Sequence, residues 1–464
     1  MRSWSAQQIA EAAGARLTAP APHGGGPARV TIDSRDVVPG DLFVGLPGET
    51  HDGGRFALQA LAAGAWGVLV APQHAEDAKC APSGVLIAAE DPLTALQSLA
   101  RAWRRKLGAS VIAITGSTGK TSTKDILAAL LAPHRATFVS RGNFNTEIGL
   151  PLELLAAPAG TEALVLEMGM RGAGQIAELA QIAEPDVGVI VNIGPAHLEL
   201  LGSIEAIAAA KAELIADLHA GATAVIPANE PLLEPHRRSD AEITTVTFGP
   251  GGDVTLASQT PEGEVAIDAQ GERIELKLDF QQQHLRGNLL AAVAAACAIG
   301  VRPGGAVTVA FSGRRGERRR LRNGVTVIDD CYNANPMSMR AALDDLAATA
   351  GEGRRVAVLG DMLELGLEEA QFHAEIGAHA AGCGVELLVA VGERSRALVD
   401  AYRDAGAGTG EVHEIADAAQ AATLVPKLMR SGDTVLVKAS RGIGLEAVAE
   451  ALVDAAEASD EAAG

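Results

Sequence analysis

Residues 111–124 read VIAITGSTGKTSTK and carry the side chains best suited to bind a chain of phosphates. An apolar, β-branched run is followed by glycines at Gly116 and Gly119 and then by Lys120 and Thr121. This order predicts a strand, a glycine-rich loop and the start of a helix. Such a loop directs backbone N–H groups at one point, where the helix dipole also favours an anion. The lysine can neutralise phosphate charge, and the threonine hydroxyl can bind Mg²⁺.

The loop is a shortened form of the general P-loop pattern. That pattern has a glycine where this chain has Ile114, so the match is to Gly-x-x-Gly-Lys-Thr alone. A glycine-rich surface turn with a solvated lysine is the alternative, but it does not explain why strand, glycines, lysine and threonine fall in this order. The residues expected to bind the nucleotide here are Gly116, Ser117, Thr118, Gly119, Lys120, Thr121 and Ser122.

Length and composition restrict the class of protein. The 464 residues are too many for one hydrophobic core and predict two or three domains. Apolar residues make up 48% of the chain and aromatic residues only 3%, so the cores should be aliphatic. The net charge of −20 argues against a nucleic-acid partner, because phosphate backbones would be repelled.

Three features favour a soluble, cytoplasmic protein. The four cysteines are far apart and form no CxxC pair, which predicts neither a disulfide framework nor a zinc site. The first residues lack the apolar core of a signal peptide. The longest apolar run, residues 289–301, is shorter than the about 20 residues that span a bilayer, so we expect no membrane insertion.

Three blocks follow one another along the chain, at residues 1–108, 109–313 and 314–464. An amphipathic helix over residues 92–106 leads out of the first block. In the second block, buried-type strands are expected at residues 111–115, 163–169, 187–194 and 222–227. In the third, they are expected at residues 325–330, 355–361, 386–392 and 433–440. Strands alternating with helices predict α/β domains with parallel sheets, the last one Rossmann-like but without a dinucleotide fingerprint.

Further polar side chains fall at strand ends in the second block. Ligands of a parallel α/β sheet bind beyond the carboxyl ends of its strands. Glu167 ends one predicted strand and His197 follows the next, so both should lie on the rim that holds the loop. Mg²⁺ prefers oxygen ligands, which suits Thr121 and Glu167, whereas His197 could serve a second metal. Each residue alone has an ordinary surface explanation, but three successive strand ends together favour a site.

Lys211 lies among alanines in a helix predicted from Ser203 to about Leu218, with Ser203 as its N-cap. Its spacing alone predicts a lysine that faces solvent.

Motifs over nearly the whole chain resemble those of the Mur ligases, the ATP-dependent enzymes that build the peptide stem of bacterial peptidoglycan. The motifs are TIDSRDVVPGDLFVGLPGE (31–49), TGSTGKTSTK (115–124), GNFNTEIGLPLELL (142–155), LEMGMRGAGQI (166–176), NIGPAHLELLGSIEAIAAAKAEL (192–214), VIDDCYNANPMSMRAAL (327–343), VLGDMLELG (358–366) and LVKASRGIGLE (436–446). The loop alone would also fit folylpolyglutamate synthases. NFNTEIGLP and DDCYNANP are more specific and resemble the members that add D-alanyl-D-alanine.

The resemblance implies an enzyme that uses ATP to join D-alanyl-D-alanine to UDP-N-acetylmuramoyl-tripeptide through an acyl phosphate. It implies three α/β domains: a small one at 1–108 for the UDP substrate, a central P-loop-type ATPase with a parallel sheet at 109–313, and a Rossmann-like one at 314–464 for ATP and the dipeptide. Two Mg²⁺ ions and a monomeric, cytoplasmic enzyme are expected with it. The third stem residue, meso-diaminopimelate or lysine, stays open.

The same resemblance suggests roles for single residues. Lys211 matches a lysine that is carbamylated by CO₂ and helps to hold Mg²⁺ together with His197 and Glu167, while Thr121 and Glu167 lie near the nucleotide-bound ion. Asn288 matches a position that contacts adenine. Arg315 matches an arginine on the γ-phosphate, with Arg314 and Arg320 of the same basic run as alternatives.

Substrate contacts are implied in all three domains. Ser34 and Arg35 match the segment that receives the uridine nucleotide. The tripeptide would face Asn143, Asn145 and Thr146. ATP and the dipeptide would meet the third domain at Asp330, Tyr332, Asn333 and Asn335.

Two segments depart from the family pattern and leave substrate contacts open. EMGMRGAGQI lacks the Asn-His pair often found after its EMG, and HDGGRF has Gly54 where histidine is common.

Three other functions compete with this ligase activity. One is a sister ligase that adds another amino acid, such as glutamate to a folate; another is a nucleotide kinase or simple NTPase; the third is a non-enzymatic scaffold with a vestigial loop. The intact Lys120, Thr121, Glu167 and His197 argue against the scaffold.

Replacing Lys120 with alanine tests the loop. We expect Lys120→Ala to abolish ATP-dependent turnover, because phosphate charge is no longer neutralised, while the far-ultraviolet circular dichroism stays that of the parent protein. Turnover is measured as phosphate release. A near-normal kcat would reject the assignment of the loop.

Overall fold

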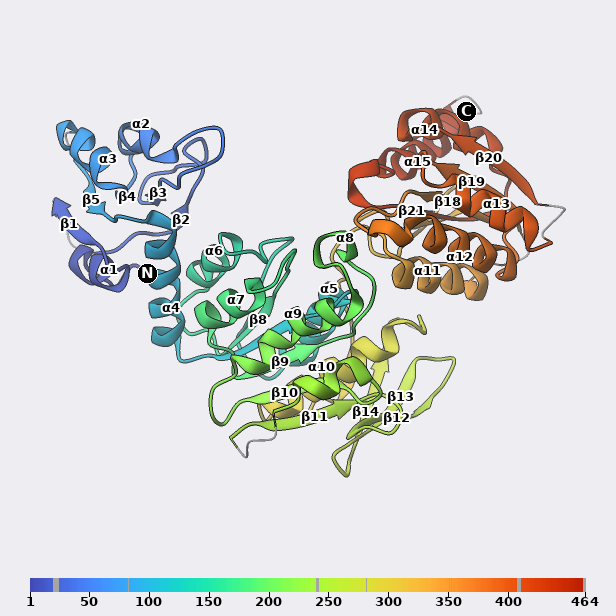
Figure 1. Ribbon diagram of the computed structural model, residues 1–464, viewed down its shortest axis with the longest axis horizontal. Coiled ribbons are helices and arrows are strands. Elements are labelled where there is room, and N and C mark those ends of the chain that lie inside the picture. Colours follow the sequence, from blue (N-terminus) through green and yellow to red (C-terminus); the bar gives the residue numbers. More distant parts are fainter. Residues whose placement is uncertain are drawn as a thin grey trace.

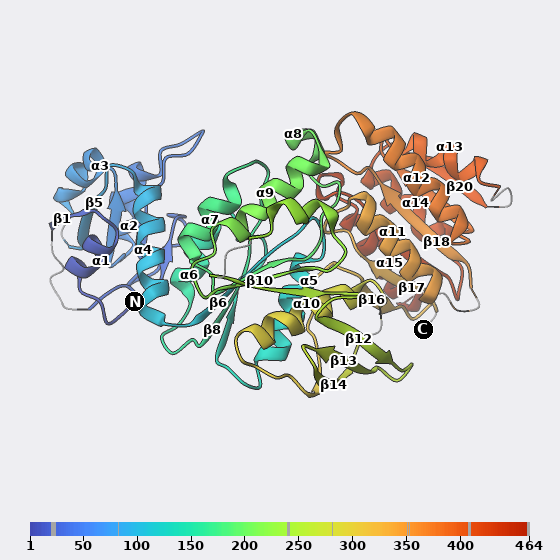
Figure 2. The same cartoon turned by 60° about the horizontal axis from the view of Figure 1, so that its bottom comes forward.

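Three α/β bodies follow one another along the chain, each built on its own sheet (Figure 1). The computed structural model describes residues 1–19, 25–81, 83–238, 242–280, 282–349, 351, 353–406 and 410–461. Figure 2, turned by 60°, again places the second body between the first and the third. Among the described residues, no helix is both long enough and apolar enough to cross a membrane.

The first body is a five-stranded sheet in the order β1-β5-β4-β3-β2. Its strands are parallel except for β1 against β5. They are β1 (Arg16–Ala19), β2 (Val30–Thr31), β3 (Leu42–Val44), β4 (Gly67–Val70) and β5 (Val85–Ala88). The helices are α1 (Ala6–Ala12), α2 (Ala57–Ala62) and α3 (Pro72–Asp77).

The predicted linking helix is α4 (Pro92–Leu107), capped by Asp91 at its start and ended by Gly108 in a left-handed conformation. It fastens the first body to the second. Trp103 of α4 is buried, stacks edge-on against Trp4, and donates a hydrogen bond from Nε1 to Ala157 O at 3.1 Å.

The second body has a ten-stranded sheet in the order β15-β14-β13-β12-β11-β10-β9-β6-β8-β7. The strands from β7 across to β12 pair in parallel, and β12, β13 and β14 pair antiparallel. The four predicted strands are present as β6 (Ser110–Thr115), β8 (Ala163–Glu167), β9 (Val187–Ile190) and β10 (Thr223–Pro227). The other strands are β7 (Thr137–Val139), β11 (Thr244–Phe248), β12 (Val254–Gln259), β13 (Glu264–Ala269), β14 (Glu272–Leu278) and β15 (Gly305–Val307). Both β8 and β9 end before the predicted boundaries, because the chain leaves the sheet there to form the rim.

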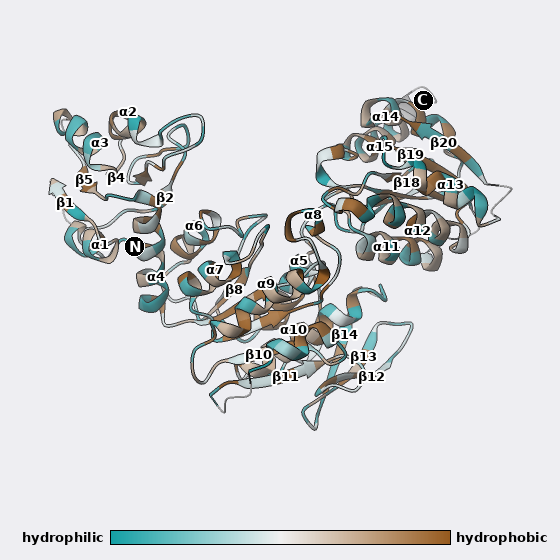
Figure 3. Ribbon diagram, viewed as in Figure 1, coloured by the Kyte–Doolittle hydropathy of each residue, from teal (hydrophilic) through white to brown (hydrophobic). Residues whose placement is uncertain are grey.

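Alternate residues of β6 pack on opposite faces of this sheet, as the period of a strand requires. Ile112 and Ile114 join the core under α5 (Lys120–Leu131) and α10 (Leu285–Ala298). Val111 and Ala113 join the core under α6 (Gly149–Ala156), α7 (Gln175–Ala183) and α9 (Ile204–Ala216). This second core also continues into the first body. The apolar strands between the helices are visible in Figure 3.

The third body has six strands in the order β16-β17-β21-β18-β19-β20, all parallel except β16. The four predicted strands are β17 (Thr326–Asp329), β18 (Arg355–Gly360), β19 (Leu387–Val391) and β21 (Thr434–Lys438), joined by β16 (Glu317–Arg320) and β20 (Glu411–Ile415). One face carries α11 (Pro336–Thr349), α12 (Glu369–Gly382) and α13 (Arg396–Asp404). The other carries α14 (Ala418–Leu428) and α15 (Glu446–Glu461).

Candidate active site

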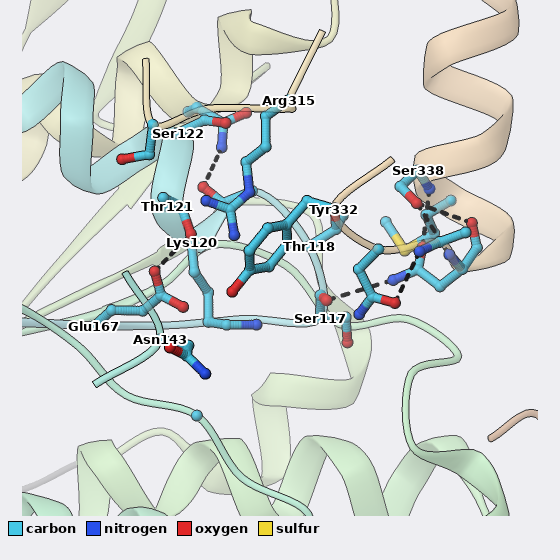
Figure 4. Close-up of a pocket in the computed structure, with 18 of the residues that line it drawn as sticks. Ser117, Thr118, Lys120, Thr121, Ser122, Asn143, Glu167, Arg315, Tyr332 and Ser338 are labelled. Atoms are coloured by element: carbon cyan, nitrogen blue, oxygen red, sulfur yellow. Dashed lines mark hydrogen bonds between the residues drawn. The ribbon is translucent and has the colours of Figure 1, made fainter. Parts of the chain in front are cut away.

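A cavity of about 1110 Å³ opens between the carboxyl ends of the central strands and the third body (Figure 4). Its walls come from the loop after β6, the ends of β8 and β9, the start of α10, and the third-body loops after β17 and β21. Strand ends that are distant in sequence therefore meet here, as expected for a parallel sheet.

The glycine-rich loop has two structural reasons for its glycines. Gly119 has a φ of +77°, and a Cβ built there would lie 2.3 Å from Nδ2 of Asn288. Gly116 has a φ of +156°, and its Cβ would lie 3.0 Å from Val191. The loop also bonds to the segment after β9, since Asn192 and Thr118 exchange hydrogen bonds of 3.0 and 3.1 Å between side chain and backbone.

Ser117 ties the loop down further. Its Oγ donates to Gly194 O at 2.8 Å and accepts from Gly194 N at 2.9 Å. From the third body, Asn335 Nδ2 donates to Ser117 O at 3.4 Å. The loop is thus held in place from two directions.

A buried carboxylate faces the start of α5. Thr121 Oγ1 donates to Glu167 Oε2 at 2.6 Å (Figure 4). Asn145 Nδ2 donates to Glu167 Oε1 at 3.0 Å. Glu167 is 4% exposed and Thr121 is also 4% exposed, so the pair is shielded from bulk water. The predicted meeting of Thr121 and Glu167 is therefore present, and together they offer oxygen donors of the kind that Mg²⁺ prefers.

Two lysines add positive charge to the same cavity. Lys120 donates to Gly116 O at 2.8 Å, and burial lowers its pKa while nearby Glu167 opposes that shift. Lys211 is 2% exposed, which corrects the solvent-facing position that its spacing predicted. Burial, and then repulsion from Lys120, hold the pKa of Lys211 well below its usual value. Among the described residues, the ammonium of Lys211 has no hydrogen-bond or ion-pair partner.

His197 lines the cavity from the start of α8 (Leu198–Leu201), with a φ of +61°. Its Nδ1 hydrogen-bonds to the carboxylate of Glu364 in the third body. Burial lowers the pKa of His197, although the bond with Glu364 opposes that shift. The imidazole is therefore favoured in its neutral form, which can bind a metal through its other nitrogen.

Asn288, near the start of α10, lies directly beside the loop. Its Nδ2 donates to Gly119 O at 2.8 Å and to Thr123 Oγ1 at 2.9 Å. Both bonds join α10 to the start of α5, so Asn288 shapes the loop in addition to lining the cavity.

Among the three candidate arginines, Arg315 is the one that the cavity lining includes. Its guanidinium stacks on the ring of Tyr332 at 3.8 Å (Figure 4). The backbone just before it is fixed to α5, because Ser312 N donates to Asp125 Oδ2 at 2.7 Å. Arg314 instead pairs with Glu450 at 2.6 Å, and Arg320 is exposed on β16.

The third body adds an ion pair whose lysine is buried. Lys438, at the end of β21, donates to Asp330 Oδ2 at 2.6 Å and to Asn333 O at 2.9 Å. Lys438 is 1% exposed, so its bonds to Asp330 and Asn333 hold the DDCYNANP segment against the end of β21. The predicted Tyr332, Asn333 and Asn335 consequently line the cavity.

The predicted tripeptide residues Asn143, Asn145 and Thr146 also line the cavity, together with Ser122. Ser34 and Arg35 do not: they follow β2 in the first body, where Arg35 pairs with Asp33 at 2.6 Å in an exposed position.

Family comparisons cover most of the chain. Residues 28–104 match the "Mur ligase family, catalytic domain", residues 114–296 the "Mur ligase middle domain", and residues 314–441 the "Mur ligase, glutamate ligase domain". The chain belongs to the Mur ligase family.

Individual relatives agree with this assignment. This Mur ligase is 36% identical to the UDP-N-acetylmuramoyl-tripeptide–D-alanyl-D-alanine ligase of Bacillus subtilis, over 92% of this chain and 93% of that one. It is 38% identical to the Mycobacterium tuberculosis enzyme of the same name, over 96% and 97%. Among solved structures, MurF from Acinetobacter baumannii superimposes with a TM-score of 0.84 at 28% identity, over 97% and 99%. MurF ligase from Thermotoga maritima in complex with ADP gives 0.77 at 30% identity, over 92% and 98%.

Sequence reasoning missed Lys438, Arg441 and Ser338 of this Mur ligase, all of which line the cavity. The strand-end rule that identified Glu167 would have found Lys438, since it is the last residue of β21.

The two departures from the family pattern have local explanations. A Cβ at Gly54 would lie 2.1 Å from the ring of His74, so glycine makes room for a histidine that comes from α3 instead. His74 Nε2 lies 2.7 Å from Asp52. Arg171, in the segment that lacks Asn-His, pairs with Glu364 at 2.7 Å.

Gly119→Ala should damage the site more than the fold. A left-handed alanine costs about 1–2 kcal/mol, and here the new Cβ must also displace Asn288. We expect ADP affinity, measured by titration calorimetry with Mg²⁺, to fall at least about tenfold.

Gly108→Ala is the matched control for this variant. Gly108 also has a positive φ, +65°, but nothing lies within 4 Å of its Cβ position. It should lose similar stability and keep its ADP affinity. Equal ADP affinity in the two variants would contradict the role given to the contact between Gly119 and Asn288.

Proposed function

We propose that this Mur ligase joins D-alanyl-D-alanine to UDP-N-acetylmuramoyl-tripeptide at the expense of ATP, a step in the synthesis of the peptidoglycan precursor. One observation carries the proposal: the phosphate loop, the Thr121–Glu167 pair and the third-body residues Arg315 and Lys438 all border one cavity. The names of relatives at 36–38% identity over more than nine tenths of the chain support the choice of substrates.

The chemistry follows from the low reactivity of a carboxylate toward amines. The terminal carboxylate of the tripeptide attacks the γ-phosphorus of ATP; the new O–P bond forms as the bond to ADP breaks. The amine of D-alanyl-D-alanine then attacks the acyl carbon of the resulting acyl phosphate. The tetrahedral intermediate expels phosphate, and the amine nitrogen gives up its proton. Such phosphoryl transfer needs mainly positioning and neutralisation of charge.

The chain's own residues supply that charge. Lys120 and Arg315 flank the space above the loop, and we assign the γ-phosphate to Arg315 rather than to Arg314 or Arg320. Asn288 would contact adenine, and Asp330, held by Lys438, would border the nucleotide. The third body covers the cavity, which limits hydrolysis of the acyl phosphate by water.

The three bodies would divide the substrates between them. We assign residues 1–108 to the UDP end, 109–313 to ATP and the tripeptide, and 314–464 to ATP and the incoming dipeptide. Ser34 and Arg35 lie outside the cavity, so a long UDP-linked substrate would connect them to Asn143, Asn145 and Thr146. We assign the enzyme to the cytoplasm and take it to act as a monomer.

The donor set fits two Mg²⁺ ions. Thr121 and Glu167 would hold the nucleotide-bound ion; Glu167, His197 and a carbamate on Lys211 would hold the second. Bound Mg²⁺ supplies neutralisation of phosphate charge. A buried amine with a lowered pKa and no anionic partner among the described residues is a good nucleophile for CO₂, and carbamylation turns it into an oxygen donor.

Lys211→Ala tests the carbamate. We expect this variant to lose activity, because one metal ligand is missing, and to recover part of it when a short carboxylic acid is added to occupy the space. Phosphate release with and without acetate is the measurement. Full activity without added acid would remove the carbamate from the mechanism.

The main experiment measures phosphate release from ATP in the presence of UDP-N-acetylmuramoyl-tripeptide. We expect release to depend on D-alanyl-D-alanine and to yield the pentapeptide product by mass spectrometry. Dependence on glutamate instead would indicate a sister ligase, and release without any peptide product would indicate an NTPase or kinase. Running the assay with both the meso-diaminopimelate and the lysine tripeptides identifies the third stem residue.

A further inference from the structure

The loop after β18 in the third body contacts α8 of the second body (Figures 1 and 2). Glu364 of this loop uses both carboxylate oxygens for the contact. Oε2 meets Nδ1 of His197, and Oε1 accepts from Arg171 at 2.7 Å. Among the described residues, both partners of the Glu364 side chain belong to the second body.

The backbone reinforces this contact. Glu199 N donates to Glu364 O at 3.1 Å, and a Cβ on Gly366 would lie 3.3 Å from Glu199 Cα. His197 and Glu364 both have left-handed backbones, with φ of 61° and 62°. Non-glycine residues adopt this conformation where the surrounding packing fixes it. The juxtaposition is therefore a built contact rather than a chance pairing of two long side chains.

The contact determines which nitrogen of His197 is available. A carboxylate at Nδ1 makes that nitrogen the N–H donor and leaves the lone pair on Nε2. We propose that Glu364 is a positioning residue, which presents Nε2 of His197 to the metal site only when the third body is docked on α8. This inference rests on the proposed function. With this contact, the metal site is complete when the third body is docked on α8, and it is incomplete in any other arrangement.

Glu364→Gln is the direct test. The amide has the size of the carboxylate but carries no charge for His197 and Arg171. Loss of such a partner behind a metal ligand costs about 10–100-fold in metal affinity or activity. We expect kcat to fall by that factor, and the Mg²⁺ affinity, measured by titration calorimetry in the presence of ADP, to fall with it, while the KM for D-alanyl-D-alanine is little changed. The Mg²⁺ dependence is the readout that a merely structural ion pair would leave unmoved.

Glu368→Gln is the matched control, since Glu368 is exposed four residues along the same segment and has no ion pair or hydrogen bond among the described side chains. It should behave as the parent protein.

Arg171→Gln covers the case in which Glu364→Gln fails to fold. This variant removes one partner of the Glu364 carboxylate and should shift the Mg²⁺ dependence in the same direction by a smaller factor. In the double variant the two effects should not add.

An unchanged Mg²⁺ dependence in Glu364→Gln and Arg171→Gln, with or without a fall in Tm, would overturn the inference. A parent protein that releases no phosphate in response to D-alanyl-D-alanine would instead overturn the proposed function. The two failures are thus distinguishable.

A second cluster lies between α11 and α12 of the third body, and none of its three residues lines the cavity. His379 and Cys383 are four residues apart at the end of α12, and Asp344 faces them from α11. His379 Nε2 lies 2.8 Å and Cys383 Sγ 3.7 Å from Asp344 Oδ1, and all three ligand atoms lie within 4.8 Å of one another. Cysteine spacing could not reveal this cluster, since two of its three members are not cysteines.

The two measured separations, 2.8 and 3.7 Å, lie on either side of those around a tetrahedral ion, so small side-chain shifts would let all three groups bind one. Zinc bonds of about 2.0 Å to nitrogen and oxygen and about 2.3 Å to sulfur place neighbouring ligands roughly 3.3–3.5 Å apart. The geometry points to a site for Zn²⁺ or a similar thiophilic ion, with Cys383 bound as the thiolate after its proton is released. Mixed sulfur and nitrogen donors select against Mg²⁺, so this site is chemically separate from the cavity.

Titration of the full chain with Co²⁺ tests the site. We expect cobalt–thiolate charge-transfer absorption in the parent protein, its loss in Cys383→Ser, and its displacement by Zn²⁺. Cys80→Ser, which removes an exposed cysteine in the first body, should keep the absorption. Absence of the band in the parent protein, or its persistence in Cys383→Ser, would overturn the inference.

Discussion

The site depends on positive charge that is buried with too little negative charge beside it. Burial lowers the pKa of both Lys120 and Lys211; repulsion from Lys120 lowers that of Lys211 further, and Glu167 opposes the shift for Lys120. Such an arrangement is costly in an empty cavity and favourable around a triphosphate, because desolvated charges interact strongly. The overall charge of −20 does not conflict with it, since a local group of cations in one cavity can attract a nucleotide while the rest of the surface stays acidic.

Much of the fold could be predicted from strand patterns alone. The predicted strands of the second and third blocks are present. From the sequence alone, the strand-end rule placed Lys120, Thr121 and Glu167 at one rim of the sheet. Such predictions succeed because a buried parallel strand must be continuously apolar and must end where the loops begin.

Features decided by packing were beyond the sequence. Lys211 looked solvent-facing because alanine is compatible with either side of a helix, and only the fold shows that its side chain points inward. In sequence, Arg315 was the match for the arginine on the γ-phosphate, and Arg314 and Arg320 were its alternatives. The bond from Ser312 to Asp125 fixes the register that turns Arg315, and not Arg314, toward the cavity.

The hydrophobic cores are divided unevenly among the three bodies. One core runs without interruption from the first body through α4 into the second, whereas the third-body cores, among the described residues, draw only on positions from Leu321 onward. The first and second bodies therefore share a core that the third body does not enter. A displacement of the third body relative to the other two would bend the chain between β15 and β16 without breaking a shared core.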